Sequence, residues 1–136
     1  MAMRLDHIGI AVKTIAEARG FYEIGLGLGT EPGIEEVAGE QVRVLKLIVP
    51  PGTHIELLEP MSPESAIGKF IEKRGPGIHH LCFACDNIVA ETARMIEAGY
   101  TPLWPEARLG AGGCLVNFFH PKQTHGVLTE LSQPPN

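Results

Sequence analysis

Hydrophobic and polar residues alternate in two short segments that lie far apart in the chain. The first, LDHIGIAV, begins at Leu5, and the second, IHHLCFA, begins at Ile78. Strict alternation predicts β-strands, because successive side chains of a strand point to opposite faces of the sheet. Each half of the chain is therefore expected to open with a strand, and each strand carries a histidine near its start, His7 in the first and His80 in the second.

Both strands are followed by segments with the spacing of an amphipathic helix. Apolar residues recur among charged ones over residues 15–24 and again over residues 88–98. Thr14 stands before the first segment, and Asp86 and Asn87 stand before the second. These side chains are suited to accept hydrogen bonds from the first free N–H groups of a helix. We predict helices over both segments, capped by Thr14 and by Asp86 or Asn87.

Strand-like runs return after each helix. Glycine-containing turns precede these runs, which cover residues 39–49, 54–58, 115–119 and 126–131. Each half of the chain then has the order β-α-β-β-β, and His7 of the first half falls on His80 of the second. A match of this kind indicates an internal repeat of two βαβββ modules, which places the chain in the α+β class.

A third helix is predicted between the halves. Ser62, Pro63 and Glu64 provide a cap, a first-turn proline and a first-turn acid, and the RGPG sequence from Arg74 would end the helix. Composition does not shift at this point, so we expect one domain over residues 1–136. The expected bounds are about 4–60 for module 1, about 62–74 for the connecting helix and about 77–133 for module 2.

Composition supports one compact domain and argues against several classes of protein. With 44% hydrophobic residues among 136, the chain can bury one core. A formal net charge of −5 without a basic stripe argues against nucleic-acid binding. The sequence shows neither a signal-peptide core at its start nor an apolar stretch long enough for a bilayer. We therefore expect a cytoplasmic protein with no membrane partner.

Three cysteines, Cys82, Cys85 and Cys114, cannot all pair within one monomer. Cys82 and Cys85 form a C-x-x-C motif, which in redox proteins stands at the start of a helix. Here the motif lies in the alternating segment HHLCFACDN, where residues three apart point to opposite faces. A redox or zinc-binding role for this pair is therefore disfavoured.

Two glutamates interrupt apolar strands late in each half, Glu56 in HIELLEP and Glu130 in VLTELSQ. Glu56 follows His7 by 49 positions (7 to 56), and Glu130 follows His80 by 50 (80 to 130). A buried carboxylate costs several kcal/mol unless it is paired or bound to a metal. Any one of these four residues alone is more often a hydrogen-bonded core residue than a ligand. Their matched positions in the repeat favour a metal site.

The expected site has two imidazoles and two carboxylates. Such a donor set suits a borderline or hard divalent ion such as Co, Mn, Zn, Ni or Fe. Without a cysteine ligand, a purely structural zinc site is less favoured. On the two histidine strands, Gly9 and Cys82 share a face with the imidazoles, so small neighbours leave room beside each ring.

Several longer motifs resemble one known group of proteins. They are DHIGIAV, ELLEP, SPESAIGKFIEKRGPGIHH, GAGG and NFFHPKQTHGVLTEL, and together they extend over residues 5–133. In this combination the chain resembles the vicinal oxygen chelate superfamily, which includes glyoxalase I, extradiol dioxygenases and the fosfomycin- and bleomycin-resistance proteins, and within it the methylmalonyl-CoA epimerase family. The resemblance implies two βαβββ modules that form a cupped mixed sheet around one divalent metal.

The resemblance also implies a function and roles for individual residues. It places the metal ligands at His7, Glu56, His80 and Glu130, with His79 as a rival of His80 that should point to the opposite face of its strand. The implied enzyme is an isomerase that epimerises methylmalonyl-CoA at the α-carbon, through removal and return of the α-proton. Glu130 resembles the family's catalytic base. A homodimer is expected from the same resemblance.

The sequence differs from the family pattern at one position. Some bacterial epimerases carry a second carboxylate on the strand that reads QVRVLKLIV here, and Val44 occupies that place. Glu56 is then expected to act as the second base. Lys46, on the same strand face as Val44, is the weaker candidate for that role.

A glycine-rich loop, a lysine and two further histidines are not assigned a single role. The loop at residues 110–113 is either a cradle of backbone N–H groups for the substrate or a plain turn. Lys122, in the HPK segment, is either a contact for coenzyme A or a solvated lysine. His54 and His125 are expected at surface or turn positions with no role in the chemistry.

Two alternative functions stay open. A glyoxalase I-type lactoylglutathione lyase would use the same ligand set, and a non-catalytic ligand-binding member of the superfamily would have a pocket without the ligands. An extradiol dioxygenase is disfavoured because it uses two histidines and one glutamate and usually has a longer chain.

Overall fold

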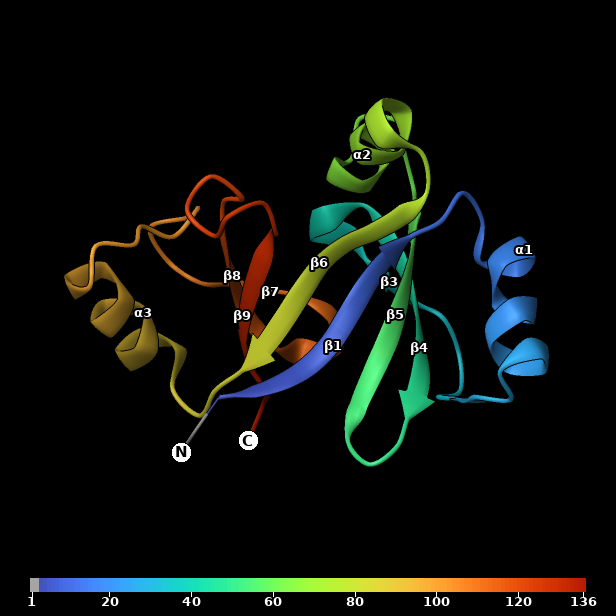
Figure 1. Ribbon diagram of the computed structural model, residues 1–136, viewed down its shortest axis with the longest axis horizontal. Coiled ribbons are helices and arrows are strands. Elements are labelled where there is room, and N and C mark those ends of the chain that lie inside the picture. Colours follow the sequence, from blue (N-terminus) through green and yellow to red (C-terminus); the bar gives the residue numbers. More distant parts are fainter. Residues whose placement is uncertain (1–2) are drawn as a thin grey trace. The chain divides into compact units, whose positions relative to one another are not determined.

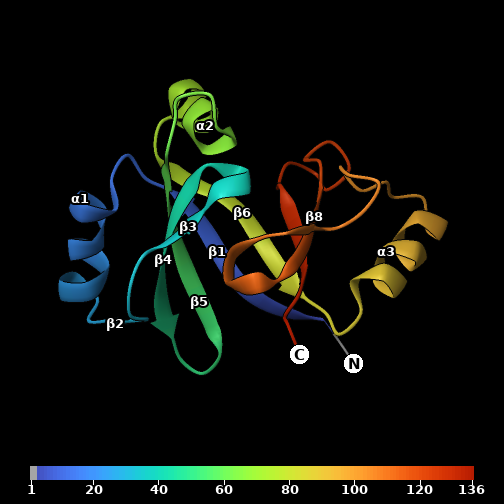
Figure 2. The same ribbon diagram turned by 180° about the vertical axis from the view of Figure 1, so that it is seen from behind.

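The computed structural model describes residues 3–136, and Figures 1 and 2 show its ribbon from two sides. The chain divides into two compact units. The first unit comprises residues 7–79, and the second comprises residues 80–136 together with the start of the chain up to Asp6. The helix predicted between the halves therefore belongs to the first unit.

The first unit is built on four strands that lie side by side in the order β2-β4-β5-β1, and a further short strand, β3, also pairs with β4. The strands are β1 (Arg4–Ala11, in this unit from His7 on), β2 (Gly29–Thr30), β3 (Glu35–Val37), β4 (Val42–Val49) and β5 (Thr53–Pro60). The helices are α1 (Ile15–Gly20), a π-helix (Phe21–Gly25), a 3₁₀-helix (Ala38–Glu40) and α2 (Ala66–Arg74).

Strands β2 and β3 act as two pieces of one strand. Both lie antiparallel to β4, β2 opposite its end at Ile48 and Leu47 and β3 opposite its start from Val44 to Val42. Strand β1 runs parallel to β5, and β4 runs antiparallel to β5. The first module thus has the predicted order β-α-β-β-β, with its second strand interrupted.

The second unit has the strand order β6-β9-β8-β7. Its elements are β6 (Gly77–Ala84, in this unit from His80 on), α3 (Ile88–Glu97), β7 (Arg108–Leu109), a 3₁₀-helix (Ala111–Gly113), β8 (Leu115–Phe119) and β9 (Thr129–Gln133). Strand β6 runs parallel to β9, and β8 runs antiparallel to it. Because this arrangement repeats that of β1, β5 and β4, the predicted mixed sheet of two βαβββ modules is confirmed.

Each unit buries its apolar residues under its first helix. Beside α1 the buried cluster consists of Val12, Ile15, Leu45, Leu47 and Leu57. Beside α3 it consists of Cys85, Ile88, Phe119 and Leu131. Full burial of one such side chain contributes about 1.5–3 kcal/mol. Since strand side chains alternate between faces, the polar residues between these positions lie on the opposite face of each sheet, away from the helix.

The caps predicted for the helices that follow β1 and β6 are present. The Thr14 hydroxyl accepts a hydrogen bond from the Glu17 N–H at 3.2 Å. In the second unit the cap is Asn87, whose side chain accepts from the Ala90 N–H at 3.1 Å. Of the two residues considered for that cap, the structure selects Asn87.

A second capping contact ties each helix to the last strand of its module. The Ile15 N–H donates to Glu59 Oε1 at 2.7 Å, and the Ile88 N–H donates to Gln133 Oε1 at 2.9 Å. Glu59 stands three residues after Glu56, and Gln133 stands three residues after Glu130. The internal repeat thus extends to individual hydrogen bonds.

The prediction for the start of α2 is wrong by four residues. The helix begins at Ala66, and its cap is Ser65, whose hydroxyl accepts from the Gly68 N–H at 3.0 Å. Residues 62–64 form a turn that folds back onto the helix. A Cβ at Gly68 would lie 2.5 Å from the Ser62 carbonyl oxygen, so the turn requires a residue without a side chain there.

The other boundaries differ where a local turn replaces the expected element. The helix predicted over residues 15–24 changes from α to π at Phe21. Hydrogen bonds from Arg19 and Thr30 to the Glu23 carboxylate hold this turn and lower the pKa of Glu23 to about 2. The strands predicted over residues 39–49 and 126–131 begin at Val42 and Thr129, after a 3₁₀-turn and a turn closed by Thr124.

Candidate active site

In the first unit, strands β1 and β5 bring a histidine and a glutamate together on the face that α1 leaves open. His7 Nδ1 lies 3.4 Å from Glu56 Oε2. Both residues are 5% exposed. The parallel register places Glu56 opposite Gly9, two residues after His7, so the small neighbour predicted beside the imidazole is the one that admits the carboxylate.

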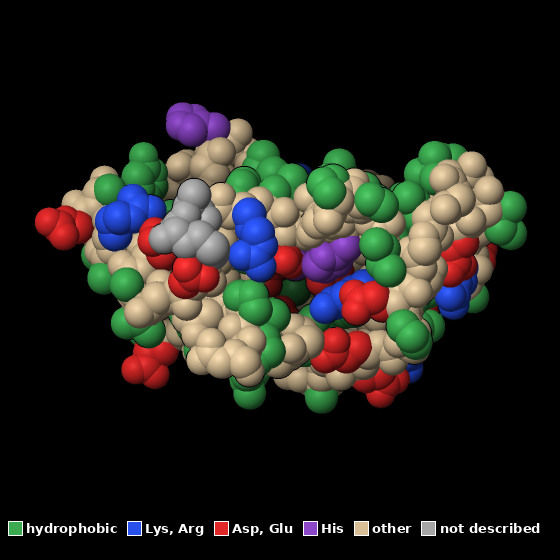
Figure 3. All heavy atoms as spheres, turned by 90° about the horizontal axis from the view of Figure 1, so that it is seen from below, with side chains coloured by type: hydrophobic (Ala, Val, Ile, Leu, Met, Phe, Trp, Pro, Cys, Tyr) green, Lys and Arg blue, Asp and Glu red, His purple; other side chains and the backbone are tan. Residues whose placement is uncertain are grey.

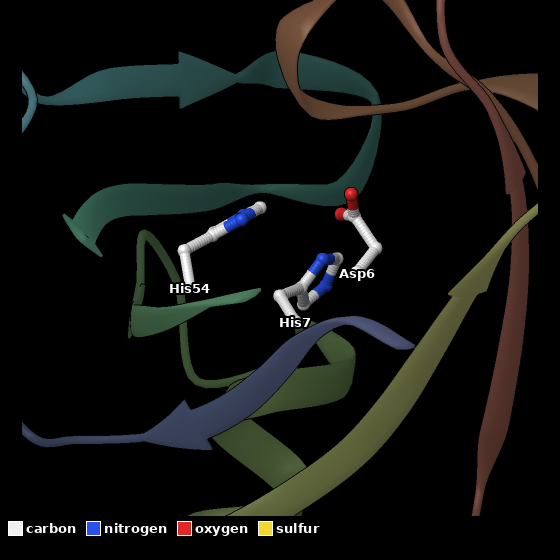
Figure 4. A group of neighbouring side chains, drawn as sticks. All are labelled: Asp6, His7 and His54. Carbon is white, nitrogen blue, oxygen red and sulfur yellow. The ribbon is translucent and has the colours of Figure 1, made fainter. Parts of the chain in front are cut away.

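His54 shares this face, and the expectation of a surface or turn position for it is wrong. It lies on β5 directly opposite His7, and Figure 4 shows the two rings next to each other. Their centroids are 5.0 Å apart. The His54 Nε2 atom is 3.1 Å from Glu56 Oε2. A signal for this contact was available, because His54 stands two residues before Glu56 in a strand and so points the same way. His125 does lie in a turn and is exposed.

In the second unit, β6 and β9 form the equivalent pair. His80 Nε2 lies 2.9 Å from Glu130 Oε1, and the two residues are 5% and 8% exposed. Glu130 lies opposite Cys82, two residues after His80. In the first unit Glu56 has the same register, opposite the residue two places after His7. The sequence alignment that matched His7 with His80 and Glu56 with Glu130 is therefore correct within each module.

The two glutamates differ in their neighbours on the antiparallel strand. Lys46 of β4 is opposite Glu56, whereas Phe118 of β8 is opposite Glu130. The Phe118 ring also lies edge-on to His80, with centroids 5.8 Å apart. Glu56 therefore has a basic neighbour, and Glu130 has an aromatic one.

His79, the rival of His80 for a ligand position, contacts a different partner. Its ring lies edge-on to Phe70 of α2, with centroids 5.0 Å apart. The Arg74 guanidinium lies over the same Phe70 ring at 5.9 Å. His79 thus contributes to packing beneath α2 in the first unit, whereas His80 contacts a buried carboxylate.

Val44, at the place of the second carboxylate of some bacterial epimerases, is 3% exposed and lies opposite Leu58. A carboxylate is therefore missing from this point of β4. Lys46 lies two residues further along the strand on the same face and is half-buried. Lys46 and Glu56, the two candidates for a second base, lie opposite each other on β4 and β5.

The glycine loop and the HPK segment have hydrogen bonds within their own turns. In the glycine loop, the Gly110 N–H donates to the Cys114 carbonyl at 2.8 Å and the Cys114 N–H donates to the Ala111 carbonyl at 3.3 Å. These bonds are those of a closed turn. Lys122 is exposed, and its N–H donates to His120 Nδ1 at 3.1 Å. On the face drawn in Figure 3, lysine and arginine side chains stand apart from one another and do not form a stripe.

The C-x-x-C cysteines point to opposite faces, as predicted. Cys82 lies on the face of Glu130 and its thiol contacts the Ser132 hydroxyl at 3.3 Å. Cys85 lies in the core beside α3, where burial and, to a smaller extent, the Glu91 carboxylate raise the pKa of its thiol. A raised pKa disfavours the thiolate that redox chemistry needs.

The donor atoms of each histidine–glutamate pair have a spacing that fits a shared ion. Two ligands bound at about 2.1 Å and about 90° to each other lie about 3 Å apart. The distances in the two pairs, 3.4 and 2.9 Å, are close to that value. Among the described residues, every buried polar side-chain atom has a hydrogen-bond partner, so these contacts satisfy the acids when no ion is present.

Comparison with known proteins places the chain in a family. The model of the glyoxalase/bleomycin resistance protein/dioxygenase superfamily matches residues 6–118. The chain belongs to this superfamily. No helix in the described part of the chain is both long and apolar enough to cross a membrane.

Within the superfamily, several relatives are named as epimerases. An ethylmalonyl-CoA/methylmalonyl-CoA epimerase of Cereibacter sphaeroides is 38% identical over 98% of this chain and 99% of its own. The methylmalonyl-CoA epimerase of Mycobacterium tuberculosis has a TM-score of 0.91 and 35% identity, covering 97% of this chain and 88% of that one. A methylmalonyl-CoA epimerase in complex with methylmalonyl-CoA and NH₄⁺ has a TM-score of 0.90 and 34% identity, covering 98% and 96%.

Proposed function

We propose that this protein is a metal-dependent isomerase that epimerises methylmalonyl-CoA at its α-carbon. The observation that carries the proposal is the pair of buried histidine–glutamate contacts, at 3.4 and 2.9 Å, in equivalent registers of the two modules. Relatives that cover nearly the whole chain carry this activity in their names. Chemistry and similarity therefore support the same reaction.

We propose further that His7, Glu56, His80 and Glu130 hold one divalent ion, of the group Co, Mn, Zn, Ni and Fe. Each pair supplies one imidazole and one carboxylate with the spacing of neighbouring ligands. When bound, the ion would stabilise negative charge on the thioester oxygen as a Lewis acid. The single domain over residues 1–136, the homodimer and the cytoplasmic location belong to the same proposal and rest on family resemblance and sequence pattern.

The α-proton of methylmalonyl-CoA is acidified by the adjacent thioester and carboxylate, and epimerisation requires its removal from one face and its return to the other. Glu130 is proposed as the group that takes or gives this proton, because a carboxylate can bind a metal through one oxygen and reach substrate with the other. Its neighbour on the antiparallel strand is Phe118. Glu56 is proposed as the second base, with Lys46 as the alternative on the adjacent strand.

The decisive experiment is exchange of the α-proton in deuterated water. The metal-loaded protein should introduce deuterium at the α-position of methylmalonyl-CoA, and Glu130→Gln should reduce that rate by about 10²–10⁴-fold, the usual contribution of a general base. A metal-loaded Glu130→Gln variant that loses less than about tenfold would exclude Glu130 as the proton carrier.

Two comparisons make this experiment specific. Glu56→Gln retains a carbonyl that can bind metal but cannot take a proton, so a near wild-type rate in this variant would leave Glu56 as a ligand only and move attention to Lys46. Activity on the hemithioacetal of glutathione, with none on methylmalonyl-CoA, would favour the glyoxalase I-type lyase instead.

A further inference from the structure

The contact between His54 and Glu56 is unexplained by the ligand set. His54 Nε2 lies 3.1 Å from Glu56 Oε2, and the His54 side chain is 17% exposed while that of Glu56 is 7% exposed. An ionised carboxylate only accepts hydrogen bonds, so the His54 ring must be the donor, through Nε2–H. His54 therefore donates a hydrogen bond to one of the two carboxylate oxygens of Glu56, Oε2.

The same oxygen, Oε2, also faces His7 Nδ1 at 3.4 Å. Two rings from adjacent strands thus meet at one carboxylate oxygen, with their centroids 5.0 Å apart and their planes tilted by 33°. A glutamate side chain has three rotatable bonds, and contacts at a single oxygen from two rigid rings leave it few orientations. These two contacts therefore restrict the orientation of the Glu56 carboxylate.

The second module shows that the fold does not require this histidine. Leu128 stands two residues before Glu130, as His54 stands before Glu56. The His80 and Glu130 pair forms in its module at 2.9 Å without an imidazole at that position. His54 lies outside the buried cluster beside α1, which consists of aliphatic residues. Its place on the open face is therefore better explained by the acid beside it than by packing.

We propose that His54 is a positioning residue that fixes the Glu56 carboxylate through the Nε2–H to Oε2 hydrogen bond. The inference rests on the proposed function, because this hydrogen bond can position a ligand only if Glu56 binds the metal. Partners of this kind, which hydrogen-bond a ligand and fix its direction, typically change metal affinity or activity by about 10–100-fold when they are removed.

The test compares His54→Leu with His54→Gln. Leucine is the residue at the equivalent place of the second module and donates no hydrogen bond, whereas glutamine places an N–H donor near the position of Nε2. We expect His54→Leu to weaken Co²⁺ binding by about 10–100-fold, measured through the visible absorption of the bound ion, and to lower kcat more than it raises KM. His54→Gln should recover most of both losses.

His79→Leu is the matched control. His79 is also a half-buried histidine of the first unit, but its ring packs on Phe70. We expect this variant to keep the wild-type dissociation constant for Co²⁺. If His54→Leu fails to fold, His54→Asn replaces it, because the shorter amide cannot reach Glu56. Equal Co²⁺ affinity in the Asn and Gln variants would then overturn the proposal.

The outcomes separate this inference from the proposed function. An unchanged Co²⁺ affinity and kcat in His54→Leu, in a protein whose wild type binds Co²⁺ and epimerises, overturn the role of His54 alone. A glutamine variant as defective as the leucine variant does the same. A wild type that binds Co²⁺ without acting on methylmalonyl-CoA overturns the function while the binding comparison still decides His54. A wild type that binds no divalent ion overturns both.

Discussion

Glu56 and Glu130 show how much two identical residues at equivalent positions can differ. Both are buried and both contact a histidine of the neighbouring parallel strand. The first has Lys46 across from it, and the second has Phe118. An acid opposite a lysine and beside two imidazoles has more polar neighbours than an acid opposite an aromatic ring. The residues next to the acids therefore distinguish them.

At this scale, the first prediction concerns which of two adjacent histidines binds metal. His80→Ala should weaken metal binding by more than about 100-fold, because it removes a proposed ligand rather than a residue that supports one. His79→Ala should retain the metal, because its ring lies on Phe70. Metal content after dialysis, measured on both variants, decides the question.

Equal metal loss in the two variants would contradict the assignment of His80, rather than His79, as the ligand on β6. The control for folding is the unfolding temperature of each variant without metal, which should equal that of the metal-free wild type.

Four single residues could be selected from the sequence, because each has a counterpart of the same type in the other module. They are His7, Glu56, His80 and Glu130. His54 could not be found in this way, because the second module has Leu128 in its place and offers no match. Strand alternation does place His54 on the face of Glu56. Alternation alone does not distinguish a functional contact from the surface position that most half-buried histidines occupy.

Secondary-structure elements were predictable where their signals are local. Thr14 and Asn87 cap the helices expected after them, and the strands at residues 115–119 and 54–58 lie where alternation placed them. The start of α2 was not predictable from its proline, because two serines compete for the cap. The turn at residues 62–64 folds onto Gly68, a tertiary contact that local sequence does not reveal.

Gly68 gives a prediction for this element. A Cβ there would lie 2.5 and 2.7 Å from the carbonyl oxygens of Ser62 and Pro63, both of which belong to the backbone. Gly68→Ala should therefore destabilise the protein by about 1–3 kcal/mol, although alanine is the better helix former. Chemical denaturation of the metal-free protein measures the change.

The control is Gly20→Ala at the end of α1. Gly20 has helical φ and ψ of −59° and −40°, and a Cβ there would meet nothing within 4 Å. This variant should be as stable as the wild type or more stable, by up to about 1 kcal/mol. A Gly68→Ala variant that is stabilised to the same extent would show that the turn at residues 62–64 moves away without cost.

For the whole molecule, the proposed metal site predicts that metal binding and folding are coupled. The four proposed ligands lie on the first and last strands of both modules, so an unfolded chain offers no assembled donor set. A ligand present at 100 times its Kd stabilises the folded state by about 2.7 kcal/mol. For a chain of this size, that should raise Tm by about 10 °C.

Thermal unfolding with and without a chelator measures this shift. His7→Ala, which removes one proposed ligand, should abolish most of it. A Tm that does not change between metal-loaded and chelated wild-type protein would contradict a site that draws ligands from both modules.

The different partners of the two glutamates have a consequence for the origin of the activity. A duplicated module supplies two copies of one histidine–glutamate pair, and two equal copies would treat both faces of a substrate alike. Inversion at a carbon atom needs a donor on one face and an acceptor on the other. The exchange of Lys46 for Phe118, and of His54 for Leu128, makes the copies unequal without disturbing the strands that carry them. For the proposed reaction, a few substitutions on one face of each sheet are therefore enough to give two duplicated acids different roles, while the cores under α1 and α3 keep the same arrangement.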